Sequence, residues 1–108
     1  MQKYNKLVRD KIPEIIKANG ETPITRTLDE KECKKELLNK LGEECEEVKS
    51  AQSSKDLLEE CADVLEVIFS IGKLEGSSEE ELIDIMRLKR IKRGGFDSRI
   101  YLESVEDK

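Results

Sequence analysis

Two acidic pairs lie in segments whose apolar spacing predicts long helices. One pair is Glu44 with Glu47, and the other is Glu60 with Asp63. Residues three apart on a helix share one face, about one turn from each other. Carboxylates directed into an apolar seam are unfavourable unless a cation meets them there. The sequence therefore predicts helices that hold a cation between them.

Helical angles separate the glutamates of the first pair from their neighbours. At about 100° per residue, an apolar stripe is formed by Leu37, Leu41, Val48 and Ala51. Glu44 falls inside this stripe and Glu47 lies on its edge. Glu43 lies further round, and Glu46 points away from the stripe. Only Glu44 is therefore expected to be directed fully inward.

The following helix is apolar over most of its circumference, and Glu60 falls between Val67 and Ile71 on its wheel. Asp63 lies beside Glu60. The polar strip of this helix is formed elsewhere, by Lys55, Glu59, Glu66 and Lys73. A helix–turn–helix connection makes the two helices antiparallel neighbours, so the two acidic pairs can face each other. The alternative is that both are solvated charge runs paired with nearby lysines.

Carboxylate oxygens are hard ligands that suit Mg²⁺, with Mn²⁺ as a possible substitute. The chain has no histidine, which excludes imidazole-based zinc sites and histidine-dependent nucleophiles. Its three cysteines, Cys33, Cys45 and Cys61, form no CxxC pair. Reduced thiols, no signal peptide and no apolar run that could span a bilayer predict a cytoplasmic protein.

A length of 108 residues suits one domain spanning residues 1–108. Charged residues make up 42% of the chain and hydrophobic ones 36%. This composition supports only a thin core, so we expect burial to be completed by a second subunit. A net charge of −5 argues against nucleic-acid polymers and membranes as partners.

Capping signals predict an all-α fold, an antiparallel bundle of about four helices. Asp10 and Pro13 indicate a short first helix, and Asp29 begins a second helix that runs to about Gln52. Ser53 caps a third helix to about Glu75, and Ser78 caps a fourth that ends at Gly94-Gly95. Residues 23–28 and 99–104 have strand-like patterns and are expected to pair as a small two-stranded ribbon.

The two acidic pairs form the pattern ExxE, a 12-residue gap, then ExxD, within KLGEECEEV (40–48) and EECADVLEV (59–67). This pattern resembles the signature of the all-α NTP pyrophosphohydrolases. That superfamily includes MazG-like enzymes, dimeric dUTPases and phosphoribosyl-ATP pyrophosphohydrolase. The flanks YNKLVRDKIPEII (4–16) and KRGGFDSRIYL (92–102) are similar to a MazG-like subgroup and depart from the histidine-pathway enzyme.

The resemblance implies hydrolysis of a nucleotide to the monophosphate and pyrophosphate, with Mg²⁺, in a homodimer or homotetramer. It implies that the metal ligands are Glu44, Glu47, Glu60 and Asp63. It also implies that Glu43 orients or deprotonates the attacking water.

Four basic residues are candidate phosphate ligands. Lys40 lies one turn before Glu44 and either reaches a phosphate or pairs with Glu44. Arg93 precedes Gly94-Gly95, whose exposed N–H groups suit a phosphate beside a guanidinium, although cations at a helix C-terminus are favoured anyway. The resemblance favours Lys6 and Arg9 closing over a triphosphate.

Three functions follow as hypotheses. The first is a magnesium-dependent nucleoside triphosphate pyrophosphohydrolase that cleans the nucleotide pool. The second is phosphoribosyl-ATP pyrophosphohydrolase in histidine biosynthesis. The third, from another class, is a non-catalytic helical dimerisation module that retains the acidic seam as a metal site.

Overall fold

The computed structural model describes residues 2–107, and these form four α-helices and no strand. The helices are α1 (Ile12–Ala18), α2 (Glu30–Lys49), α3 (Ser54–Leu74) and α4 (Glu79–Arg93). The prediction of an all-α fold is confirmed. The predicted ribbon between residues 23–28 and 99–104 is wrong.

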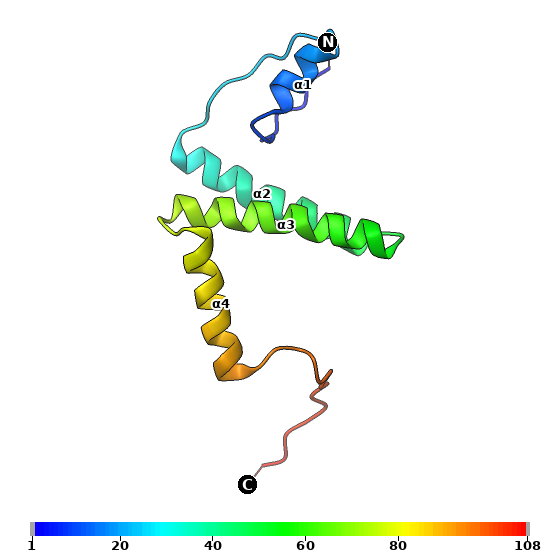
Figure 1. Cartoon of the computed structure of the whole chain (residues 1–108), viewed down its shortest axis with the longest axis vertical. Coiled ribbons are helices and arrows are strands. Elements are labelled where there is room, and N and C mark those ends of the chain that lie inside the picture. Colours follow the sequence, from blue (N-terminus) through cyan, green and yellow to red (C-terminus); the bar gives the residue numbers. More distant parts are fainter. Residues whose placement is uncertain (1, 108) are drawn as a thin grey trace.

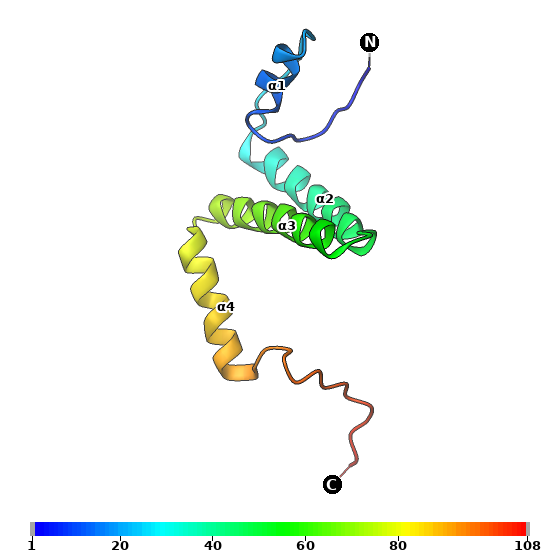
Figure 2. The ribbon, with the colours of Figure 1, turned by 45° about the vertical axis from the view of Figure 1, so that its right-hand side comes forward.

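The four helices are arranged around one antiparallel pair (Figure 1). Helices α2 and α3 lie side by side along their lengths, and α4 contacts α3 alone. Helix α1 packs against none of the other helices and lies apart from them in both views (Figures 1 and 2). The chain is elongated as a result, with extents of 66 × 35 × 25 Å.

The ribbon is absent because its two segments lie at opposite ends of the molecule (Figure 1). Residues 23–28 lead into α2, whereas residues 99–104 follow α4, which carries the chain away from the α2–α3 pair. A strand needs a hydrogen-bonding partner, and a lone two-stranded ribbon is at best marginal in water. The strand-like spacing of both segments is thus not sufficient to pair them.

Side-chain caps begin three of the helices as the sequence predicts. The Glu32 N–H donates to Asp29 Oδ1 at 2.8 Å at the start of α2, and Ser53 Oγ accepts from the Asp56 N–H at 3.1 Å. Ser78 caps α4 in the same way. The predicted cap at Asp10 is wrong, because α1 begins later and Lys11 occupies its N-cap position without a side-chain bond.

The connection between α3 and α4 depends on two glycines. Gly76 has φ = 82°, a left-handed conformation that glycine adopts without steric cost. A Cβ on Gly72 would lie 3.3 Å from Leu82 Cδ2, so Gly72 allows the start of α4 to approach α3 closely. These two positions set the direction in which α4 leaves the pair.

The core of the single chain is small. Among the described residues only Leu37 of α2 and Val67 of α3 are buried, each 6% exposed. They lie on the facing sides of the two helices that pack together. The α2–α3 pair is therefore the stable centre of the chain, and it is this pair that carries the acidic residues.

Candidate metal centre

Three carboxylates converge between α2 and α3. Glu44 extends from α2, and Glu60 and Asp63 extend from α3. One oxygen from each lies within 4.8 Å of the other two, and all three side chains are half-buried. We call these residues the acidic cluster. The cluster arises because the short turn at residues 50–53 folds α3 back antiparallel to α2.

The orientation of α2 selects among its glutamates as the helical angles predict. The Glu44 side chain is 18% exposed, whereas that of Glu46 is 73% exposed. Glu43 is exposed and lies outside the acidic cluster. Glu47 is exposed too, and offers no oxygen to the group of three. The structure thus assembles three of the four predicted ligands.

The acidic cluster suits a hard divalent cation. Oxygen ligands of one octahedral Mg²⁺ ion lie about 3–4 Å from one another. The oxygens of the cluster lie within 4.8 Å of one another, so a bound ion would draw them slightly closer together. Glu44, Glu60 and Asp63 would hold such an ion with carboxylate oxygens alone, the donor set expected for Mg²⁺ or Mn²⁺.

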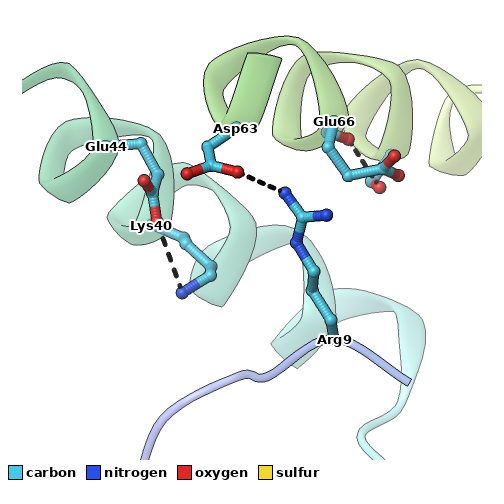
Figure 3. Close-up of polar contacts among 6 residues, drawn as sticks. Arg9, Lys40, Glu44, Asp63 and Glu66 are labelled. Atoms are coloured by element: carbon cyan, nitrogen blue, oxygen red, sulfur yellow. Dashed lines mark hydrogen bonds and ion pairs between the residues drawn. The ribbon is translucent and has the colours of Figure 1, made fainter. Parts of the chain in front are cut away.

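Two cationic side chains contact the acidic cluster (Figure 3). Arg9, from the segment before α1, donates from Nη2 to Asp63 Oδ1 at 2.7 Å. Lys40 Nζ lies 3.7 Å from Glu44 Oε1, one helical turn away on α2. Lys40 thus pairs with Glu44, and its predicted contact with a phosphate stays a prediction. The second oxygen of Asp63 points toward Glu44 (Figure 3).

The other two predicted phosphate ligands form no ion pair with the cluster in the described part of the chain. Lys6 Nζ lies over the ring of Tyr4, at 5.6 Å from its centroid. Arg93 is the last residue of α4, at the end remote from α3 (Figure 1). Within one chain, therefore, Arg9 and Lys40 are the predicted phosphate ligands that reach the carboxylates.

Comparison with known proteins gives one partial relative. A protein of Mycolicibacterium smegmatis, named only as uncharacterized, is 47% identical over 53 residues. The match covers 49% of this chain and 54% of that protein, so the chain spans about half the length of its relative. No family profile matches the chain, and no solved structure matches it.

None of the helices within residues 2–107 combines the length and apolar character that a bilayer crossing requires.

The pKa of Glu60 is raised above its ordinary value of 4.5. Desolvation between the helices is the largest cause, followed by the negative charge of Asp63 and then of Glu47 and Glu44. Although Glu47 contributes no oxygen to the cluster, it therefore adds to the negative field there. A cation bound among these carboxylates would relieve the same repulsion.

This shift predicts how stability depends on pH when divalent ions are absent. Between the ordinary pKa of Glu60 and its raised folded value, the folded chain binds more protons than the unfolded chain, so stability falls as pH rises through that window. In EDTA, Glu60→Gln is expected to melt higher than wild type at neutral pH, with the difference shrinking in acid. Thermal unfolding followed by circular dichroism measures this.

Glu59→Gln is the matched control, since Glu59 is an exposed neighbour on the same helix. It should leave the melting temperature and its pH dependence near those of wild type. Equal stabilisation by both substitutions would mean that overall negative charge, and not crowding in the acidic cluster, sets the effect.

Proposed function

We propose that this chain is a magnesium-dependent nucleoside triphosphate pyrophosphohydrolase of the MazG-like all-α type. The reaction consumes a nucleoside triphosphate and one water, breaks the α–β phosphoanhydride and releases the nucleoside monophosphate and pyrophosphate. The observation that carries this proposal is the acidic cluster, in which carboxylates of two antiparallel helices converge. The ExxE and ExxD pattern of the same helices supports it.

The residues around the cluster take the following roles in the proposal. Glu44, Glu60 and Asp63 hold the cation, and Glu47 strengthens the negative field or joins them when an ion is bound. A bound Mg²⁺ supplies positive charge against the phosphates and acidity to a water. Glu43, next to the cluster on the exposed side of α2, orients or deprotonates that water.

In the proposal Lys40 and Arg9 bind phosphate oxygens; their ion pairs with carboxylates of the cluster support this by showing that both lie beside it. Lys6 and Arg93 belong to the same proposal only if the chain or a second subunit brings them closer. Guanidinium and ammonium groups are the usual phosphate partners in proteins. A nucleotide substrate and reduced thiols together also make the cytoplasm the proposed location.

The proposal includes a homodimer or homotetramer. The chain exposes 10202 Å², whereas a compact monomer of this length exposes about 6,000 Å². The excess of about 4,000 Å² is more than one subunit contributes to most obligate dimer interfaces, about 1,000–2,500 Å². Burial of such an area by further copies of the chain would supply the core that one copy lacks.

Further copies would also complete the site. Two shallow hollows of about 390 and 320 Å³ lie on the chain, and neither is lined by the acidic cluster. The first lies between the start of α2 and the end of α3, and the second lies on α4. In the proposal, a neighbouring subunit provides the walls that enclose a nucleotide at the cluster.

Pyrophosphate release from a panel of NTPs, dNTPs and phosphoribosyl-ATP tests the proposal. We expect release with Mg²⁺ and none with EDTA. Preference for phosphoribosyl-ATP would instead favour the histidine-pathway reaction. Metal binding without release from any nucleotide would favour the non-catalytic module.

A further inference from the structure

The segment from residue 2 to residue 20, which we call the N-terminal strap, is fastened to the helices by one polar contact. Within residues 2–107, the Arg9–Asp63 ion pair is the only hydrogen bond or salt bridge between this strap and helices α2, α3 and α4. Helix α1, which lies in the strap, packs against none of them. Asp63 is therefore the one side chain of these helices that makes a polar contact with the strap in the described part of the chain.

That carboxylate belongs to the acidic cluster. Asp63 is one of the three residues whose oxygens converge, and its Oδ1 is occupied by the Arg9 guanidinium at 2.7 Å. The guanidinium thus supplies positive charge at the place where three carboxylates repel one another. A divalent cation at the cluster would supply twice that positive charge on a single atom and would be repelled by Arg9.

We propose that Arg9 and a divalent cation compete for Asp63, so that metal binding releases the N-terminal strap. This rests on the metal-binding part of the proposed function and not on the hydrolysis. Once released, the guanidinium is free to pair with a phosphate group held at the same cluster, a contact that it makes well in bidentate form. Metal occupancy thereby prepares the strap to close over an anionic ligand.

The proposal predicts the direction in which metal affinity changes when the Arg9–Asp63 ion pair is removed. If the ion pair and the metal exclude each other, removal of the ion pair must strengthen metal binding, because coupling between two binding events is reciprocal. If Arg9 instead positioned Asp63 for the metal, its removal would weaken metal binding, typically by about 10- to 100-fold. Whether loss of Arg9 strengthens or weakens metal binding therefore decides between competition with the metal and positioning of Asp63 for it.

Calorimetric titration of wild type and Arg9→Ala with Mn²⁺ and with Mg²⁺ measures whether metal affinity rises or falls. Both side chains of the pair are partly exposed, 56% for Arg9 and 43% for Asp63. Loss of an exposed ion pair of this kind changes an equilibrium constant by about 1.4- to 5-fold. Arg9→Ala is therefore expected to bind metal more tightly by a factor in that range. Lys3→Ala removes the same charge from the same strap without breaking an ion pair and should bind as wild type does.

Amide hydrogen exchange of residues 2–20 measures release of the strap. Helix α1 has seven residues, too few for a stable isolated helix, so the freed strap should exchange faster. In wild type, metal should accelerate exchange; in Arg9→Ala, exchange should already be fast and unaffected by metal. Arg9→Lys, which keeps the charge, should behave close to wild type.

Weaker metal binding by Arg9→Ala, or exchange of the strap that metal leaves unchanged in wild type, overturns the competition. Absence of any metal binding by wild type overturns it together with the proposed cofactor. Neither readout uses turnover, so failure of the hydrolysis is seen separately. A chain that binds metal and releases its strap without forming pyrophosphate would retain this inference and lose the proposed reaction.

Discussion

Glu44→Gln is expected to lower magnesium-dependent pyrophosphate release by about 100-fold or more. Glu44 is the residue through which α2 joins the acidic cluster, since the other two members come from α3. Glutamine keeps the size of the side chain and removes its charge. Changes in groups that only orient a metal ligand already lower affinity or activity by about 10- to 100-fold, so loss of a ligand should exceed that. Initial rates of release at saturating Mg²⁺ measure the effect.

The fold of this variant should be intact, because the amide replaces a carboxylate that opposes two others across the helix pair. Far-ultraviolet circular dichroism should therefore report wild-type helix content. Glu60→Gln, on α3, is expected to lose activity in the same way. A residual activity near that of wild type in both variants would show that the acidic cluster is not the catalytic metal site.

Glu46→Gln is the matched control on α2. The Glu46 side chain is 73% exposed and pairs with Lys49 at 3.4 Å, on the face away from α3. Its loss should leave the rate near that of wild type, because a surface pair of this kind contributes little. If Glu46→Gln reduced the rate as much as Glu44→Gln, the assignment of inward and outward glutamates on α2 would be wrong.

Local signals in the sequence are enough to predict where α2, α3 and α4 begin. Asp29, Ser53 and Ser78 can satisfy N–H groups two or three residues ahead whatever the rest of the chain does, and the helices begin where these residues predict. Helical angle likewise distinguishes Glu44 from Glu46, because rotation about an axis is set by the backbone alone. Both features are set by residues that lie within a few positions of one another in the sequence.

Features that depend on distant segments are not predicted in the same way. Residues 23–28 have the spacing of a strand, but the direction of α4 removes the segment that was to pair with them. Glu47 has the spacing of a fourth ligand, yet the packing of α2 on α3 leaves it exposed. The contact of Arg9 with Asp63 joins residues 54 positions apart, and no local pattern carries that information.

Leu65→Glu is expected to break the proposed homodimer or homotetramer. Leu58, Cys61, Ala62 and Leu65 are all exposed on α3, and their spacing of three and four residues forms an apolar stripe suited to another helix. A glutamate at the middle of a buried stripe would have to be desolvated without a partner. We expect association to weaken by about 100-fold or more, which analytical ultracentrifugation over a range of concentrations measures. Wild type should sediment as a dimer or tetramer.

Leu65→Met is the control, since it keeps the volume and apolar character of the side chain. It should assemble as wild type does. Should Leu65→Glu assemble equally well, the contact between subunits would lie elsewhere on the chain, for example on α4, where Leu88 is 65% and Ile91 is 83% exposed.

Assembly and stability are expected to fall together. Within its described part a single chain buries only Leu37 and Val67, each 6% exposed, so the separated subunit has little to oppose the loss of conformational entropy on folding. The melting temperature of wild type should therefore rise with protein concentration, as it does for obligate oligomers, and Leu65→Glu should melt lower at every concentration. If the wild-type melting temperature did not depend on concentration and the ultracentrifuge showed monomers, the prediction that a second subunit completes the core would be wrong. The acidic cluster would then have to bind its ligand on the open surface of one helix pair.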